Sequence, residues 1–520
     1  MATDAAERYE QLKLDRDGPL RRARQCAELT LPALMPPENQ TEGQDLPIPA
    51  QGFGARAVNN LASKLLLTLM PPNQPFYKLT PTPKIKRELE QRGDDSLTQV
   101  NAALSRIEQS MLTAIEGSAD RVTTYEAIRH LVVCGNALIW MPNEGGMKMY
   151  RIDQYVIQRD PMGHLLEAVI HERVAKETLD EDTRQACLSD GEENDDADGN
   201  ADVDVYTHIE LDHDEGEWKV QQEINGVKVP GSEGTYPEDK PGFIALRWSA
   251  VSDEDYGRSL VYEHIGDLRS LEGLTDAVNA FAGNAAKILW LVNPNGQTNP
   301  KKLNRAKSGE FVPGDVNDIA ALTMEKYPDF QMVTSRIQSI ESRLQQAFLL
   351  TASVQRDAER VTATEINLMA RELEDALGGV YSVLSQEFQV PYVVRKLEQL
   401  QNDDTIESLP DKAVEPQITT GLEALGRGHD LSKLNGLLSD IGQLPPQVAA
   451  QMIQRFNVDN LLNRLTTAHG INTEGLIKSQ QQVQQETQQG MAQQVMQDAA
   501  PGVAQEAVKA AAAQNTPPSQ

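Results

Sequence analysis

The sequence predicts a mainly helical fold of the α+β class with one small antiparallel β region. Apolar residues recur at spacings of three and four along several long segments, which is typical of helices with one buried face. Between residues 147 and 237 the apolar period changes to two, which is typical of strands. The 520 residues exceed what one hydrophobic core usually organises, so two or more core-bearing regions are expected.

The first third of the chain alternates helical segments with Pro-rich breaks. Its clearest helix begins at Ser96, and we expect one face of that helix to be buried. The apolar stripe on this face consists of Leu97, Val100, Leu104, Ile107, Met111 and Ile115.

The region of period two predicts a small antiparallel sheet. Asn225-Gly226 supplies the backbone freedom that a tight hairpin needs. Residues 177–204 hold twelve acidic residues against one Arg and have little apolar content, so we expect an exposed, mobile loop there. The alternating apolar or half-polar positions are Val203, Val205, Thr207, Ile209 and Leu211.

Two later segments carry the apolar seams of an antiparallel helix pair. The first, Leu268 to Val292, would be about 37 Å long as a helix. The second seam contains Ile337, Ile340, Leu344 and Phe348. The stretch between them opens with the turn-like Asn293-Pro294-Asn295-Gly296 and is rich in Lys early on, so a small lobe is expected at the tip of the pair.

The last third begins with a capping box, Thr362-Ala363-Thr364-Glu365, in which Thr362 and Glu365 satisfy free amides at a helix start. The long helix that follows is interrupted by Gly378-Gly379 and by Pro391, and a bend is expected at either place. A loop from Asn402 to Pro416 is expected next, followed by short helices to about Lys478. The Gln- and Ala-rich tail beyond is either an assembled helix or disordered.

Composition limits the function classes. A formal net charge of −29 argues against a broad grip on nucleic acid, because phosphate binding needs clustered Lys and Arg. Three widely spaced cysteines without a C-x-x-C pair fit a reducing compartment. No signal-peptide pattern occurs, and the longest apolar runs are shorter than a membrane span. We therefore expect a soluble, non-secreted protein without membrane insertion.

One acidic segment matches a calcium-loop template in part. Asn194, Asp196, Asp198 and Gly199 occupy its positions one, three, five and six, but Val205 stands where the bidentate Glu is required. This favours a solvated acidic loop over a metal site.

Enzyme motifs are also poorly matched. His208 and His213 lie near acidic residues, but a spacing of five across a strand end does not bring them together, which favours polar residues on an exposed strand face and turn. The sequence contains no G-x-x-x-x-G-K-[ST], G-x-S-x-G or H-E-x-x-H motif. We therefore predict no enzyme activity, no cofactor and no metal.

Several segments together resemble the portal proteins of short-tailed bacteriophages, the podovirus type with its own single-subunit RNA polymerase. The resemblance covers nearly the whole chain except the acidic loop and the tail. The segments that carry it are Gly54-Ala-Arg-Ala-Val-Asn-Asn-Leu-Ala-Ser-Lys-Leu, Tyr155-Val-Ile-Gln-Arg-Asp, Tyr256-Gly-Arg-Ser, Arg360-Val-Thr-Ala-Thr-Glu-Ile, Glu372-Leu-Glu-Asp-Ala-Leu-Gly-Gly-Val-Tyr and Val414-Glu-Pro-Gln.

The resemblance implies the portal fold, a homododecameric ring around a channel, the head-to-tail connector of the virion. The divisions that follow from it are a wing with the β region at residues 1–265, a first stem helix at 266–292, a clip at 293–333, a second stem helix at 334–350, a tunnel loop at 351–361, a long wing helix at 362–401, a crown at 402–478, and a barrel helix or disordered tail at 479–520.

The resemblance also implies a function at the unique capsid vertex. Double-stranded DNA would pass through the channel during packaging and ejection. The terminase large subunit and then the tail would dock on the ring, with the major capsid and scaffolding proteins, a tail adaptor and internal core proteins as further partners. Assembly would take place in the cytoplasm of the bacterial host. The alternative is a non-conducting structural adaptor of the tail or inner core, against which the long helix pair counts.

Within such a ring, the acidic chains oppose adhesion to a duplex that carries one negative charge about every 1.7 Å. DNA is therefore expected to slide, with a few rings of cations as local contacts. For each candidate the alternative is a solvated charge or an intersubunit ion pair. The candidates are Lys287, Lys301, Lys302, Arg305 and Lys307, with Arg356 and Arg360 in the predicted tunnel loop.

Overall fold

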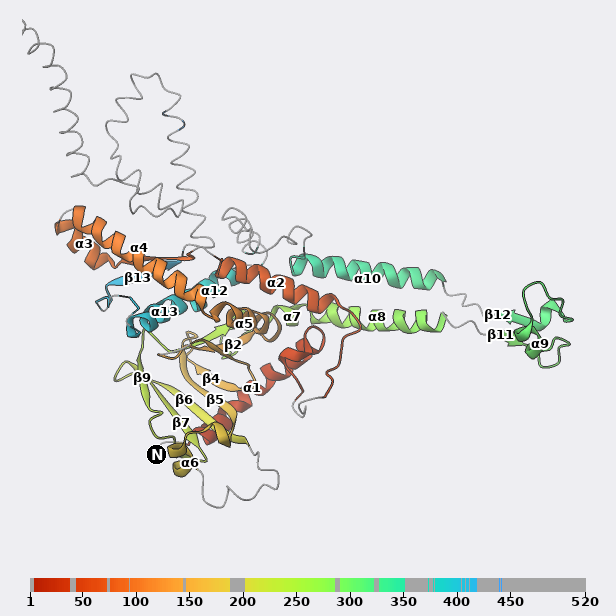
Figure 1. The fold of residues 1–520 in the computed structure, drawn as a ribbon, viewed down its shortest axis with the longest axis horizontal. Coiled ribbons are helices and arrows are strands. Elements are labelled where there is room, and N and C mark those ends of the chain that lie inside the picture. Colours follow the sequence, from red (N-terminus) through yellow and green to blue (C-terminus); the bar gives the residue numbers. More distant parts are fainter. Residues whose placement is uncertain are drawn as a thin grey trace, which may run out of the picture. The chain divides into compact units, whose positions relative to one another are not determined.

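The computed structural model describes most of the chain before residue 419. The described residues are 4–37, 44–72, 75–92, 94–143, 146–187, 202–285, 290–321, 327–350, 373, 377, 379–403, 405–406, 408–410, 412–418, 439 and 441. The chain forms two compact units, Met1–Leu425 and Gly426–Gln520. Helices and a small antiparallel β region make up the first unit, as predicted (Figure 1).

The N-terminal helix α1 (Ala5–Glu28) packs against one face of the β region (Figure 1). Asp4 caps it, since its side chain accepts a hydrogen bond from the Ala6 amide at 3.2 Å. After the short 3-10 turn η1 (Pro32–Leu34), α2 (Phe53–Leu69) and α5 (Asp120–Cys134) pack against each other. Between them in sequence lie α3 (Pro83–Arg92) and α4 (Asp94–Gly117).

The predicted helix at Ser96 is confirmed as α4, which begins two residues earlier. Its apolar stripe faces the core, and the stripe residues that are buried are Leu104, Ile107, Met111 and Ile115. The periodicity located this helix because four buried positions at spacings of three and four fix one face.

Two antiparallel sheets form the β region. The smaller has the order β10-β2-β3, from Phe243–Arg247, Asn136–Trp140 and Lys148–Tyr150. The larger follows the path β4-β5-β6-β7-β8, with β9 also paired to β7. Its strands are Tyr155–Arg159, Leu165–Ala175, Asp202–Asp212, Glu217–Ile224, Val227–Lys228 and Gly234–Pro237.

The predicted hairpin at Asn225-Gly226 is confirmed and joins β7 to β8. Asn225 has a φ of 51° and Gly226 a φ of 73°, as a two-residue turn of this hand requires. The pairing of β6 with β7 is continuous from Val205–Ile224 to Asp212–Glu217.

The prediction of an exposed loop over residues 177–204 is wrong at both ends. Residues Glu181–Cys187 form helix α6, and β6 already begins at Asp202. Asp180 starts the helix by accepting a hydrogen bond from the Thr183 amide at 2.6 Å. Cys187 is buried in a small apolar cluster with Val203, so the few apolar residues of this acidic segment suffice to fix its ends. Residues 188–201, which include the partial calcium-loop match, lie outside the described residues.

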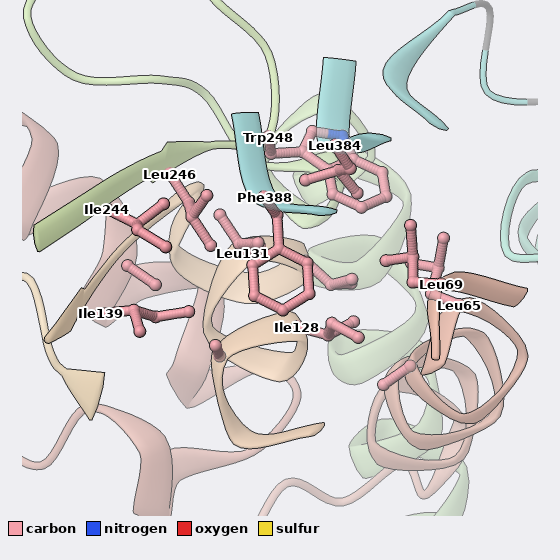
Figure 2. Packing of buried hydrophobic residues seen from close by; sticks show 14 of the residues in the cluster. Leu65, Leu69, Ile128, Leu131, Ile139, Ile244, Leu246, Trp248, Leu384 and Phe388 are labelled. Carbon is pink, nitrogen blue, oxygen red and sulfur yellow. The ribbon is translucent and has the colours of Figure 1, made fainter. Parts of the chain in front are cut away.

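One main core joins segments that are far apart in the sequence. Phe388 lies among side chains of α2, α5, β2 and β10, including Leu69, Leu131 and Ile139 (Figure 2). Trp248, just after β10, is 1% exposed and belongs to the same cluster. The core therefore forms only when residues near 65, 130, 245 and 385 have come together.

The helical segment after residue 379 is interrupted as predicted. Gly379 has a φ of 93°, which an α-helix cannot contain, and α12 (Val380–Leu384) begins directly after it. A π-helical turn, Ser385–Gln389, leads into α13 (Val390–Asn402). The turn widens just before Pro391, which has no amide hydrogen and crowds the preceding turn. The capping box lies outside the described residues.

The first unit, Met1–Leu425, also contains a strand pair that the sequence did not predict. β1 (Tyr77–Pro81) pairs with β13 (Val414–Ile418), which lies within the segment expected to be a loop. Its register is set by partners more than 300 residues apart, such as Tyr77 and Ile418.

Three charged or polar side chains fix α13 to α5. Lys396 lies 3.0 Å from Asp120, and the Tyr392 hydroxyl donates to the same carboxylate at 2.7 Å. The side chains of Asp120 and Lys396 are only 1% and 8% exposed. A buried carboxylate is tolerated here because a cation and a hydroxyl both contact it.

The predicted helix pair is present with different ends. α8 (Ile265–Ala285) follows the short α7 (Leu260–Glu263) and packs against α10 (Tyr327–Ala347) (Figure 1). The first helix was predicted to reach Val292, but Trp290–Val292 form strand β11, because these β-favouring residues pair with β12 (Ile319–Ala321). The second helix begins seven residues before the predicted Thr334.

All three cysteines are buried and free. No described helix is both long enough and apolar enough to span a membrane.

Candidate nucleic-acid interface

The structure describes four of the seven predicted DNA-contact residues. Lys301, Lys302, Arg305 and Lys307 lie in one small lobe, residues 290–321, between the two long helices. We call this segment the tip lobe. Lys287, Arg356 and Arg360 lie outside the described residues.

The helix pair that carries the tip lobe is held by apolar contacts at its base. Leu268 and Leu271 of α8 and Ile340 and Leu344 of α10 are at most 1% exposed. Nearer the tip, the rings of Phe281 and Phe330 approach to 5.0 Å between centroids.

An ion pair crosses the two helices at the same base. Arg343 Nη2 lies 2.6 Å from Asp267 Oδ1, and Arg343 Nε donates to Asp267 Oδ2 at 3.2 Å. The hydrogen bond from Arg343 lowers the pKa of Asp267, and the same bond raises the pKa of Arg343. Both side chains are partly exposed, so solvent weakens the pair.

Most cations of the two helices are engaged within the chain. Arg269 donates to Gln25 of α1 at 3.1 Å, and Arg343 contacts Asp267. Glu272 of α8 accepts from the Ala50 amide at 2.8 Å, which holds the segment before α2 against α8. Arg336 is the one cation in the described parts of α8 and α10 for which no hydrogen bond or ion pair is observed, so the helix pair offers few free positive charges.

The tip lobe is organised by a polar knot between Thr298 and Asp318. Asp318 Oδ2 accepts from both the amide and the hydroxyl of Thr298, each at 3.0 Å. The Asp315 amide donates to the Thr298 hydroxyl oxygen at 2.8 Å. The hydrogen bond from the Thr298 amide lowers the pKa of Asp318. These contacts hold the start of α9 (Pro300–Arg305) beside the 3-10 turn η3 (Val316–Asp318).

Two glycines allow the knot to close. A Cβ at Gly296 would lie 2.4 Å from the Asp318 carboxyl, and one at Gly314 would lie 2.5 Å from the Thr298 hydroxyl oxygen. Neither position has room for a side chain.

The four basic side chains project from this frame into solvent. Asn299 caps α9 by accepting from the Lys301 and Lys302 amides at 3.0 and 3.4 Å, and Pro300 follows as its first residue. All four residues are exposed, and none has an ion-pair partner among the described residues. The tip lobe holds four basic and three acidic residues, whereas the whole chain carries −29.

This arrangement suits contact with phosphates and not the reading of bases. Exposed Lys and Arg on a short helix act as point charges that attract a polyanion without sequence preference. The sequence predicts these cations as DNA contacts, but it does not predict the polar knot that positions them. The run Thr298-Asn299-Pro300 was the available signal, because a cap residue followed by Pro marks a helix start.

The described residues contain no cluster of three or more possible metal ligands. The predicted exposed position of His208 is wrong, because α1 covers that face of the sheet. His208 Nε2 lies 2.7 Å from Glu167, whose other contact is Arg8 of α1 at 2.6 Å. Burial would raise the pKa of Glu167, but the hydrogen bonds from His208 and Arg8 lower it to about 2. His213 is exposed, as predicted.

Comparison with known proteins identifies the class of protein to which these features belong. A family model described as bacteriophage head to tail connecting protein matches residues 2–477, so the chain belongs to this family. Members form an oligomeric ring that connects the capsid, the tail and the DNA, and the chain is therefore a structural component of the virion.

Individual relatives sharpen this assignment. The chain is 42% identical to the portal protein of Escherichia phage T7 over 94% of its own length and 91% of that protein's. It is 43% identical to the portal protein of Enterobacteria phage T3, over 92% and 88% of the two chains. It is 31% identical to the portal protein of Pseudomonas phage phiKMV, over 94% of both. The predicted resemblance to portal proteins is thereby confirmed.

Among solved structures, the chain is similar to one from the neck of a native gene transfer agent particle computed with C12 symmetry. The TM-score is 0.34 and the identity 11%, over 77% of this chain and 89% of that chain.

Proposed function

We propose that twelve copies of the chain form a ring at the unique capsid vertex, and that double-stranded DNA passes through this ring during packaging and ejection. The observation that carries the proposal is the cluster of four unpaired cations on the tip lobe of a chain that is otherwise strongly acidic. This contrast favours brief, local contacts with the duplex over adhesion along the channel.

The physical reason is the balance between attraction and release. Each phosphate contact strengthens binding of the duplex. It also makes the logarithm of the binding constant fall with the logarithm of the salt concentration, with a slope of about −0.9 per contact. A few contacts per subunit guide the duplex, whereas acidic surfaces repel it. Within the proposed ring, Arg356 and Arg360 of residues 351–361 and Lys287 form further contact points.

In this proposal the wing comprises residues 1–265 and the long helix at 362–401, and the stem comprises 266–292 and 334–350. The clip is formed by 293–333, the tunnel loop by 351–361, the crown by 402–478, and a barrel helix or disordered tail by 479–520. The clip, which contains all of the tip lobe after Val292, docks the terminase large subunit and then the tail adaptor. Major capsid, scaffolding and internal core proteins contact the rest of the ring. Assembly takes place in the host cytoplasm, and the chain catalyses no reaction and needs no cofactor or metal.

The test removes the charges of the tip lobe. Ala replaces all four basic residues, Lys301, Lys302, Arg305 and Lys307. The number of subunits in each purified ring is then read from class averages obtained by electron microscopy. Twelvefold rings with unchanged assembly but fewer DNA-filled heads are expected, because these side chains contact no described carboxylate whose loss would unfold the lobe.

The matched control is another short helix, α3, on which three cations are exposed. Lys84→Ala, Lys86→Ala and Arg87→Ala on α3 change a similar amount of charge far along the sequence, and DNA filling is expected to stay normal. Normal filling in both variants would contradict the contact role. A ring that never cross-links to DNA in filled heads would instead support the non-conducting adaptor.

The predicted tunnel-loop residues have a separate test. Arg356→Ala with Arg360→Ala is expected to leave the ring intact and to impair packaging or retention of DNA. Normal genome content in such particles would refute their role.

A further inference from the structure

A cavity of about 270 Å³ is lined by residues from both sheets of the β region. The smaller sheet contributes the aromatic rings of Trp140, Tyr150 and Phe243. Trp140 of β2 is directly paired with Phe243 of β10, and their rings stack with 6.1 Å between centroids and 11° between planes. Tyr236 of β9 meets Phe243 edge to face at 6.3 Å. The cavity therefore has an aromatic wall, against which flat apolar groups pack well.

The polar side chains that the larger sheet contributes already have partners. Thr207 of β6 and Gln222 of β7 are directly paired, and Gln222 Nε2 donates to the Thr207 hydroxyl oxygen at 3.2 Å. The Ser232 hydroxyl accepts from the Gln222 amide at 3.0 Å and donates to a backbone carbonyl at 2.7 Å. Thr207 is buried, whereas Gly234 of β9 is exposed, so the cavity is reached from the side of β9.

The indole N–H of Trp140 has no partner in the described part of the chain. Its Nε1 atom is buried, and no hydrogen-bond acceptor contacts it there. Buried donors are nearly always satisfied, because a hydrogen bond that is not made inside the protein is costly. Since Trp140 lines the cavity, an acceptor that enters the cavity can reach this donor.

Charge and size limit what the cavity can hold. None of the described residues that line it carries a charge, so an ion there would lose its hydration without compensation. A dry apolar cavity of about 150 Å³ holds one benzene molecule. The volume of about 270 Å³ therefore has room for two fused rings. Water is a poorer occupant, because each molecule needs two to four polar partners and the aromatic wall offers few.

We propose that this cavity is a binding site for a neutral molecule with one or two aromatic rings and a carbonyl oxygen. The rings pack beside Trp140, Phe243 and Tyr236, and the carbonyl oxygen accepts the hydrogen bond from Trp140 Nε1. A molecule bound there joins the two sheets of the β region. The site lies within one chain, so it depends neither on the ring nor on DNA, and its failure would leave the proposed function untouched.

The test uses two probes on the full-length chain. 1-Indanone has two fused rings and a ketone, and indane has the same rings without the oxygen. Saturation-transfer NMR titrations give the dissociation constant of each, and both probes are expected to bind saturably. Hydrogen exchange should slow in β2, β7 and β10 when either probe is added, and should stay unchanged in α8 and α10. No saturable binding, or protection outside the strands that line the cavity, would overturn the proposal without any variant.

The variant Trp140→Phe keeps an aromatic ring and removes the indole N–H. It should weaken binding of 1-indanone about fivefold and change that of indane by less than about twofold, because only the ketone accepts the hydrogen bond. Trp218→Phe is the matched control, since Trp218 does not line the cavity and its Nε1 donates to the Glu238 carbonyl at 3.4 Å. Both constants should stay at the parent value in this control.

Three outcomes would contradict the hydrogen bond from Trp140. They are an unchanged constant for 1-indanone in Trp140→Phe, equal weakening of both probes in that variant, and the same selective loss in Trp218→Phe. If Trp140→Phe does not fold, the titrations and the hydrogen exchange of the parent chain still decide whether the cavity binds the probes.

Discussion

The main core and the tip lobe differ in the kind of contact that stabilises them. In the core, Trp248 is 1% and Phe388 3% exposed, and helices and strands from distant parts of the chain meet around them. In the lobe, Phe311 is 101% exposed, and the described side chains that are buried are those of the Thr298–Asp318 knot. The difference indicates that apolar burial stabilises the core, whereas polar contacts organise the described part of the lobe.

The largest effect is expected from Phe388→Ala. Removing the buried ring costs about 3–5 kcal/mol of unfolding free energy through lost transfer energy and a cavity. Phe311→Ala in the monomer is the matched control and should change stability by less than about 0.5 kcal/mol. Chemical denaturation of monomers measures both. Similar losses for the two variants would remove the distinction between core and lobe.

The next effect concerns the buried ion pair of the core. Lys396→Met removes the cation beside the buried Asp120 carboxylate, leaves the hydrogen bond from the Tyr392 hydroxyl, and should cost about 3 kcal/mol. Lys13→Met breaks an exposed pair with Glu10 at 2.9 Å and should cost at most about 1 kcal/mol. Denaturation midpoints of the two variants give the comparison. Equal midpoints would show that removing the cation from the buried Asp120 carboxylate costs no more stability than breaking the exposed ion pair.

Acid should weaken the attachment of α1 to the sheet. Glu167 has a pKa of about 2 in the folded chain, below its unfolded value, so its contribution is present above pH ~4.3 and is lost as the pH falls towards 2. Glu167→Gln should flatten this dependence and lower stability at neutral pH by about 2 kcal/mol. The measurement is the melting temperature between pH 6 and 2. An unchanged profile in the variant would exclude Glu167 as the titrating group.

A smaller effect is expected from Gly296→Ala, which forces a Cβ towards the Asp318 carboxyl. Overpacking of this kind costs about 1–2 kcal/mol and should open the lobe without altering the core. Gly273→Ala on α8, where no atom lies within 4 Å of the added Cβ, should stabilise the helix slightly. Hydrogen exchange in rings resolves the two regions. Unchanged lobe exchange in Gly296→Ala would show that the knot does not hold the lobe.

Periodicity predicted the elements whose contacts repeat locally. The helix at Ser96, the β7–β8 hairpin and the helix pair were found because a buried face or a two-residue turn leaves a regular pattern. Element ends were less accurate. Trp290–Val292 continue the apolar seam of α8, and only their pairing with β12 makes them a strand.

The candidate site shows the same limit. Lys301, Lys302, Arg305 and Lys307 were identified from charge against an acidic background, and the structure places all four on one exposed lobe. The Thr298–Asp318 knot was not predicted, because it joins residues twenty positions apart through one hydroxyl and one carboxylate. Such a contact leaves no period in the sequence.

The sequence by itself therefore determined the fold class, the portal resemblance, the helix pair and the cations of its tip. These follow from local periodicity, charge and motif, which the order of residues records directly. Only the tertiary structure decided that β1 pairs with β13, that α1 covers His208, and that Thr298 and Asp318 are buried together in the lobe. The physical reason is that burial and strand pairing depend on what lies nearby in space, and those neighbours come from distant parts of the chain.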